Sequence, residues 1–141
     1  MAAEVKKARV KWVENMKFVG TGPSGNSMVM DTPPRVGGEG SAVTPGELML
    51  IGLGGCTAVD VVSILNKMRV KFDDLAVDIE AEPVETHPKV YKTIKMYYRF
   101  KGCEDQNKAQ KAVVMSKDKY CSVSAMLSKT ADIDYEIIFE D

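Results

Sequence analysis

Two cysteine residues, Cys56 and Cys121, are the strongest candidates for chemistry in this chain of 141 residues. They lie 65 positions apart, and no two cysteines have the Cys-x-x-Cys spacing of metal knuckles and thioredoxin-type redox sites. If the fold brings the two thiols together, they form a dithiol that can reduce peroxides. If the fold keeps them apart, they are two small apolar side chains of the core.

The surroundings of each cysteine decide whether its thiol ionises, and the thiolate is the reactive form. Cys56 follows an apolar, glycine-rich run, so burial should raise its pKa unless a cation lies nearby. Arg35, in an irregular loop upstream, is the best-placed cation, and its alternative interpretation is an exposed loop arginine. Cys121 is expected in the first turn of a short helix capped by Asp118, where the helix dipole lowers a thiol pKa.

Three further residues have both a structural and a functional interpretation. Glu47 completes a capping box with Thr44, and its carboxylate could also orient Arg35. His87, the only histidine, lies in a turn before a strand, and the turn is the favoured interpretation over a catalytic role. Cys103 is expected to be an exposed turn residue. No spacing supports a metal site, a Ser-His-Asp triad or a phosphate-binding glycine loop, so we expect neither a metal nor a cofactor.

Hydrophobic periodicity places these residues in an α+β fold. Three short strands are predicted at residues 8–12, 16–20 and 27–31, followed by a loop rich in Pro and Gly at 32–42. A helix begins at Thr44 and is apolar on every face as far as Val59. Alternating patterns predict later strands at residues 75–82, 93–100 and 133–139, and helical patterns lie at 104–115 and 119–127.

Composition and charge narrow the class of protein. A net charge of −1 argues against nucleic acid as a partner, because phosphate binding needs a clustered basic excess. The first residues have no apolar core of a signal peptide, and the uncharged run at 48–59 is too short to span a bilayer. Three cysteines, an odd number, indicate free thiols in a reducing cytoplasm. We therefore expect a cytoplasmic protein with a single domain over residues 1–141 that binds neither nucleic acid nor membrane.

The apolar helix indicates a second copy of the chain. Two small sheets would have to cover all its sides, and Gly52, Gly54 and Gly55 each cost ~1 kcal/mol of helix propensity against Ala. A helix with that cost allows another backbone to approach closely. Pairing it with its symmetry mate across a two-fold axis buries both helices, so we expect an intimate homodimer.

Three segments resemble the OsmC/Ohr family of osmotically inducible and organic hydroperoxide resistance proteins. They are Arg35 with Thr44-Pro-Gly-Glu-Leu48, then Gly54-Gly-Cys-Thr-Ala-Val-Asp-Val-Val62, then Tyr120-Cys-Ser-Val-Ser-Ala-Met-Leu127, and the order of elements matches along essentially the whole chain. The runs around the cysteines also resemble the YhfA-type branch. The resemblance implies antiparallel sheets wrapped around a long buried central helix in an intertwined homodimer, with two active sites at the interface.

The same resemblance implies a thiol-dependent peroxidase. Cys56 would attack an organic hydroperoxide and become a sulfenic acid, Cys121 would condense with it to a disulfide, and a dithiol reductant would restore both thiols. Arg35 would hold the thiolate and the peroxide oxygen, and Glu47 would hold Arg35. The chain departs from the peroxidase branches where Gly46 takes the place of their glutamate and the acid follows one residue later, a rotation of ~100° on a helix.

Substrate choice and an alternative function follow from the same interface. An apolar pocket from Met49, Leu53 and the partner helix is expected to prefer alkyl or lipid hydroperoxides over hydrogen peroxide. The alternative is a non-catalytic, stress-related dimer that binds a small apolar or thiol-reactive ligand at this interface.

Overall fold

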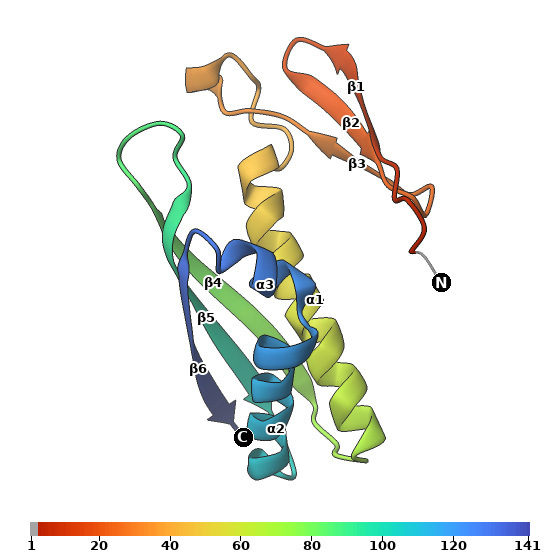
Figure 1. Cartoon of the computed structure of the whole chain (residues 1–141), viewed down its shortest axis with the longest axis vertical. Helices are drawn as coiled ribbons and strands as arrows, with labels where there is room; N and C mark the ends of the chain where they lie inside the picture. Colours follow the sequence, from red (N-terminus) through yellow and green to blue (C-terminus); the bar gives the residue numbers. More distant parts are fainter. Residues whose placement is uncertain (1–2) are drawn as a thin grey trace. The chain divides into compact units, whose positions relative to one another are not determined.

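The structure is a computed structural model that describes residues 3–141. The chain forms two compact units, one ending at Met49 and the other running from Leu50 to Asp141. In chain order (Figure 1) the elements are β1 (Arg9–Glu14), β2 (Lys17–Thr21), β3 (Ser27–Met30), the 3-10 turn η1 (Pro34–Val36), α1 (Pro45–Lys67), β4 (Asp74–Pro83), β5 (Tyr91–Lys101), α2 (Gln106–Met115), the π-helical turn η2 (Ser116–Tyr120), α3 (Ser122–Leu127) and β6 (Asp132–Glu140).

The first unit contains the predicted meander. Its three strands pair antiparallel in the order β1-β2-β3, with Trp12 opposite Phe18 and Val19 opposite Val29. Asn15, at a φ of 46°, makes the tight turn between β1 and β2. Several large apolar side chains of this sheet are exposed, namely Val10, Trp12, Val13, Met28 and Val29. The meander therefore has more apolar surface than the described chain covers.

Helix α1 begins where its capping residues predict. The Thr44 N–H donates to Glu47 Oε2 at 3.0 Å, and the Glu47 N–H donates to Thr44 Oγ1 at 3.1 Å. This reciprocal pair is a capping box, which satisfies backbone donors that the helix itself cannot pair. The helix ends at Lys67, after which Arg69 adopts a φ of 59° and the Val70 N–H bonds to the Leu65 carbonyl at 3.0 Å.

Only one face of α1 is buried in the second unit. The buried residues recur at helical spacing and are Leu53, Gly54, Thr57, Val61 and Leu65. Ile51 and Val59 are 51% and 69% exposed, so the expected enclosure on every side is not achieved within the described chain. By length and composition alone α1 could cross a membrane, a criterion that core helices of soluble proteins also meet.

The second unit is a three-stranded sheet in the order β4-β5-β6, with α1, α2 and α3 on one face (Figure 1). Strands β4 and β5 pair antiparallel as expected, with Val77 opposite Tyr98. Strand β6 pairs parallel to β5, with Ile137 opposite Tyr98, which corrects the expectation of wholly antiparallel sheets. The reason is the connection: α2, η2 and α3 carry the chain back to the starting end of β5, as parallel pairing requires.

The core lies between this sheet and the helices. Alternate residues of β5 are fully buried, namely Ile94, Met96, Tyr98 and Phe100, and they pack with residues of α1 and α2. The other face of the sheet has charged pairs across strands, including Arg99 with Asp78 at 2.7 Å. This pair places an acidic side chain of β4 beside a basic one of β5, an arrangement that stabilises neighbouring strands.

The segment before Cys121 differs from its prediction. Helix α2 begins after Asp105, whose side chain accepts the Lys108 N–H at 3.1 Å, close to the predicted start. The chain then winds through the π-helical turn η2, and α3 follows with Cys121 itself as the N-cap residue. The expected cap, Asp118, lies inside η2 instead. Widened turns of this kind occur often at functional sites.

Candidate functional site

The fold brings Cys56 and Cys121 together with Asp60. Cys56 and Asp60 lie one turn apart on α1, so their side chains leave the same face of the helix. Cys121 reaches this face from the junction of η2 and α3. The two sulfur atoms and a carboxylate oxygen of Asp60 all lie within 4.8 Å of one another, and both cysteines are free thiols.

Backbone hydrogen bonds hold Cys121 in place. Its N–H donates to the Ser116 carbonyl at 2.8 Å, which closes the π-helical turn. Its Sγ accepts the Ser124 N–H at 3.4 Å, the bond of an N-cap side chain. The side chain is only 3% exposed. Cys121 is therefore a buried, fixed thiol, whereas Cys56 is half-buried.

The surroundings move the two thiol pKa values in opposite directions. Burial raises the pKa of Cys56, but hydrogen bonds from the Val123 N–H, the Cys121 thiol and the Ser122 hydroxyl outweigh it, so the pKa is lowered overall. Burial raises the pKa of Cys121 to about 11, and the Ser124 N–H offsets this only in part. The prediction that the α3 N-terminus lowers the pKa of Cys121 is thus wrong, because desolvation is larger. The N-terminal donors of α3 stabilise the Cys56 thiolate instead.

A chain of buried hydroxyl groups ends on Asp60. The Ser116 hydroxyl donates to Asp60 Oδ2 at 2.9 Å, and Thr57 Oγ1 lies 2.7 Å from both Ser116 Oγ and Tyr98 Oη. A hydroxyl has one proton to donate, and Ser116 donates its proton to the carboxylate. Thr57 must therefore donate to Ser116, and Tyr98 must donate to Thr57.

Sequence reasoning missed this network and the role of Asp60. Burial raises the pKa of Tyr98 to about 12, so the phenol keeps the proton that it donates. The available signal was the pair of polar residues Thr57 and Asp60 in an otherwise apolar stretch of helix. Asp60 falls four residues after Cys56, the spacing that places two side chains on one helix face.

The other two predicted site residues lie in the first unit. Arg35 is exposed in the turn η1, and Glu47 is exposed at the start of α1. The carboxylate of Glu47 is held in the capping box with Thr44. Among residues 3–141 no hydrogen bond or ion pair joins Arg35 to Glu47, so the structural interpretation of Glu47 is confirmed and its contact with Arg35 stays a prediction.

Asp31 anchors the loop that contains Arg35, which sequence reasoning did not anticipate. Its buried carboxylate accepts the Thr32 N–H at 2.7 Å and the Ser41 N–H and hydroxyl at 3.1 and 2.6 Å. These bonds, led by the Ser41 hydroxyl, lower the pKa of Asp31 to about 2. Gly38 completes the arrangement, because a Cβ there would collide with the Thr32 carbonyl oxygen and with Asp31. Both ends of the loop are thus tied to one carboxylate.

His87 and Cys103 lie outside this cluster. His87 is exposed in the turn between β4 and β5, which agrees with the turn interpretation. Cys103 is half-buried just before α2, packed against the core rather than exposed as expected, and its thiol donates to the Asp105 carbonyl at 3.6 Å. Neither residue belongs to the group of ligand atoms around Cys56.

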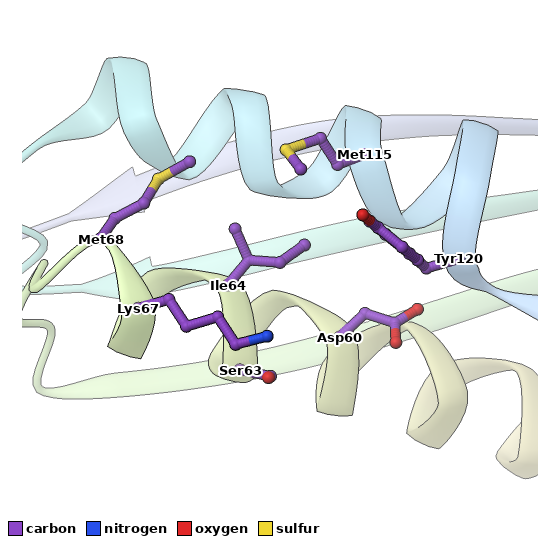
Figure 2. Close-up of a pocket in the computed structure, with 7 residues that line it drawn as sticks. All are labelled: Asp60, Ser63, Ile64, Lys67, Met68, Met115 and Tyr120. Atoms are coloured by element: carbon purple, nitrogen blue, oxygen red, sulfur yellow. The ribbon is translucent and has the colours of Figure 1, made fainter.

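A pocket of about 350 Å³ lies between α1 and the α2–η2 segment. Figure 2 shows Asp60 and Tyr120 at one end of it and Met68 at the other. Ile64 and Met115 add apolar walls, so the pocket is mainly apolar with a carboxylate at one end. The expected pocket wall, Leu53, is instead fully buried in the core. Leu53 is therefore not a pocket wall, whereas a pocket that Met49 forms with a partner helix stays a prediction.

Comparison with known proteins gives a consistent relationship. A family model described as "OsmC-like protein" matches residues 38–136. Protein YhfA of Escherichia coli strain K12 is 39% identical over 136 residues, which covers 94% of this chain and 98% of YhfA. A solved structure of a hypothetical protein from Aquifex aeolicus is 30% identical, with a TM-score of 0.79 over 99% of this chain and 100% of that one.

A more distant structure shares the fold. It is described as an organic hydroperoxide resistance protein OsmC from Legionella pneumophila, is 19% identical, and has a TM-score of 0.71 over 98% of this chain and 99% of that one. The family model spans both cysteines, and the alignment with YhfA covers nearly the whole of both chains. The chain therefore belongs to the OsmC-like family.

Proposed function

We propose that this protein is a thiol-dependent peroxidase that reduces organic hydroperoxides, with Cys56 as the attacking thiol and Cys121 as the resolving thiol. Membership of the OsmC-like family supports a redox or peroxide-stress function. The single observation that carries the proposal is the position of the two sulfur atoms, within 4.8 Å of each other as free thiols. A disulfide can form from this arrangement by small side-chain movements.

The proposed reaction has two steps before reductant enters. The Cys56 thiolate attacks one peroxide oxygen, the O–O bond breaks, and the alkoxide takes up a proton and leaves as an alcohol. Cys56 is then a sulfenic acid. The Cys121 sulfur attacks the Cys56 sulfur, the S–O bond breaks, and hydroxide leaves with a proton as water. An external dithiol returns the disulfide to two thiols by exchange.

The opposed pKa shifts suit these two roles. The lowered pKa of Cys56 favours the thiolate that attacks peroxide, and the raised pKa of Cys121 keeps a thiol proton available to donate to it. The negative charge on Cys56 and its hydrogen bond both raise the pKa of Cys121. Oxidation of Cys56 to a sulfenic acid removes its thiolate charge, while burial, the largest cause of the raised pKa of Cys121, remains. Cys121 therefore ionises more readily once there is a sulfenic acid to resolve.

The pocket beside Asp60 supports an organic substrate. Its walls of Ile64, Met68 and Met115 (Figure 2) suit an alkyl chain. Asp60, at its other end, lies beside the two cysteines. Proteins of the same fold are described as organic hydroperoxide resistance proteins, including one from Vibrio cholerae with captopril bound in one of its active sites. An alkyl hydroperoxide is accordingly the substrate class that we assign.

Arg35 and Glu47 complete the proposed site. A guanidinium beside Cys56 would stabilise the thiolate and the departing oxygen, a role for fixed charge that lysine does not reproduce. Asp31 holds the loop that contains Arg35. Glu47 uses Oε2 in the capping box, and its Oε1 is the atom that we assign to Arg35.

The proposal includes a homodimer in the cytoplasm, with residues 1–141 as a single domain. The exposed residues Ile51 and Val59 support it, because a helix with apolar residues on its outer face needs a covering surface. At Gly52 and Gly55 no described atom beyond the adjoining residues and backbone of α1 lies within 4 Å of where a Cβ would stand, which leaves room for a second backbone. A two-fold contact between two α1 helices would cover this face in both chains.

Mass spectrometry after a brief pulse of tert-butyl hydroperoxide tests the reaction. Wild type should form a Cys56–Cys121 disulfide, and Cys121→Ser should stop at a sulfenic acid and then overoxidise, because it has no resolving thiol. Cys56→Ser should lose rapid peroxide consumption, and Cys103→Ser is the matched control that should behave as wild type. Arg35→Ala should slow the reaction and raise the pKa of Cys56, whereas Arg9→Ala should do neither.

Two outcomes would reject this assignment. An unmodified Cys56 in protein that still consumes peroxide would show that another group reacts. If wild type consumes no organic hydroperoxide at all, the alternative function, a non-catalytic dimer, replaces the peroxidase proposal. That dimer would bind a small apolar or thiol-reactive ligand, and the pocket beside Asp60 is where binding should then be sought.

A further inference from the structure

The group formed by Cys56, Cys121 and Asp60 has the composition of a metal site. Two thiols and one carboxylate have their donor atoms within 4.8 Å of one another. We propose that the reduced protein binds one thiophilic divalent cation, of which Zn²⁺ is the type, through both sulfur atoms and a carboxylate oxygen of Asp60. The sequence has no Cys-x-x-Cys pair. The fold instead brings together two ligands on one face of α1, Cys56 and Asp60, and a third at the N-cap of α3, Cys121.

The geometry is close to what zinc requires. With Zn–S bonds of about 2.3 Å and Zn–O bonds of about 2.1 Å, donor atoms in a tetrahedral site lie roughly 3.5–3.8 Å apart. The present separations, at most 4.8 Å, therefore need to close by no more than about 1.3 Å, which side-chain rotation can supply. Cys56 and Asp60 chelate from adjacent turns of one helix, and Cys121 approaches from α3.

Two of the three ligands are already oriented by a neighbour. Ser116 donates to Asp60 Oδ2, which leaves Oδ1 for a cation. The Ser124 N–H donates to Cys121 Sγ, a bond that a metal-bound thiolate keeps. Hydrogen bonds of this kind to the ligands raise metal affinity in known sites. The buried hydroxyl chain fixes the direction of the Ser116 hydroxyl, which in turn holds the Asp60 carboxylate. Binding of a cation therefore costs little further side-chain entropy.

The bonding selects the class of cation. Two thiolates favour zinc, cadmium or copper(I) over magnesium and calcium, which prefer oxygen ligands, and the carboxylate favours a divalent ion. Binding forms two metal–sulfur bonds and one metal–oxygen bond, and it displaces the thiol protons to solvent without oxidation of any group. With three protein ligands, a fourth position stays open to water or a small thiol. A bound cation would occupy both sulfur atoms and block their attack on peroxide.

Titration of the reduced full-length protein with Co²⁺ and Zn²⁺, without peroxide, tests the site. Wild type should bind one cation per chain and give the strong visible absorption of tetrahedral cobalt with thiolate ligands. Cys56→Ser and Cys121→Ser should lose that absorption, and Asp60→Asn should weaken zinc binding roughly tenfold or more. Cys103→Ser and Asp118→Asn remove the same groups elsewhere and should bind as wild type. Absence of binding in wild type, or cysteine variants that bind the cation as tightly as wild type, would overturn the proposal.

A second measurement needs no variant. Zinc should slow alkylation of Cys56 and Cys121 by iodoacetamide at least tenfold, while Cys103 in the same chain stays reactive and serves as the internal reference. Uniform alkylation with and without zinc would also reject the site. Because neither assay contains peroxide, the result stands apart from the peroxidase assay, which is run with a chelator present. A failure of metal binding is therefore distinguishable from a failure of peroxidase activity.

Discussion

The Ser116 hydroxyl donates a hydrogen bond of 2.9 Å to Oδ2 of Asp60, and this bond sets the direction of the whole buried chain behind it. Its donor lies at the start of η2, and its acceptor lies on α1, 56 residues earlier. The bond joins the helix that contains Cys56 to the turn that leads to Cys121. The carboxylate thus lies beside two thiols that it makes harder to ionise, since the charge of Asp60 raises the pKa of both.

Asp60→Asn should therefore make Cys56 more reactive at neutral pH. The substitution removes a negative charge that raises the pKa of Cys56, so the thiolate fraction should begin to rise at a lower pH than in wild type. The pH dependence of alkylation, followed at Cys56 by mass spectrometry with a metal chelator present, measures the shift. Asp118→Asn is the control, because this exposed carboxylate lies in the same turn as Ser116. Identical pH profiles for wild type and Asp60→Asn would contradict the electrostatic role of Asp60.

Thr57→Val should destabilise the fold. Valine has the same shape but leaves the buried Tyr98 hydroxyl with only the weak acceptor Met96 Sδ at 3.9 Å, and it removes the donor to the buried Ser116 hydroxyl. An unsatisfied buried polar group costs about 1–3 kcal/mol, so the free energy of unfolding should fall by at least this amount. Urea unfolding measures it. Thr130→Val, on an exposed residue, should change stability by less than about 0.5 kcal/mol. Equal stability of the two variants would show that water replaces the lost bonds.

The elements that were predicted correctly are those with local signals. The start of α1 depends on Thr44 and Glu47, three residues apart, and the buried face of β5 follows from simple alternation. The parallel pairing of β6 could not be predicted in this way. Its direction depends on the path of α2, η2 and α3, and the same alternation fits either direction of pairing.

The candidate site shows the same limit. Both cysteines could be selected from the sequence, but their proximity depends on how α3 folds back on α1. The inverted order of the thiol pKa values was missed for a related reason. The donors that lower the pKa of Cys56, among them the Val123 N–H, come from a segment distant in the sequence. The burial that raises the pKa of Cys121 follows from core packing around α3, which helix-dipole reasoning does not include.

Asp31 should make the stability of the protein sensitive to acid. Its pKa in the folded state is about 2, below the ordinary value of 3.8, so the ionised form is stabilised by folding. This contribution is fully present above pH 3.8 and is lost as the pH falls toward 2. The stability difference between wild type and Asp31→Asn in urea should shrink over that range. A difference that is constant with pH would mean that the Asp31 hydrogen bonds persist in the unfolded chain.

Gly54 and Gly55 provide a matched pair for the proposed dimer, because they face different surroundings. A Cβ at Gly54 would stand 3.0 Å from Ile79 Cδ1 in the same chain, so this glycine accommodates a side chain of β4 rather than another backbone. Gly54→Leu should therefore lower the stability of the fold by about 1–3 kcal/mol through overpacking. At Gly55 no described atom beyond the adjoining residues and backbone of α1 lies within 4 Å of the Cβ position.

Gly55→Leu should leave each chain able to fold but prevent close approach of a second α1. Light scattering at micromolar concentration should report a dimer for wild type and a smaller particle for Gly55→Leu, with helix content retained in circular dichroism. If Gly55→Leu stays dimeric, the contact lies on another surface, and the exposed apolar residues of the meander, such as Trp12 and Val29, become the place to test next. A wild-type protein that is a stable monomer would reject the dimer itself.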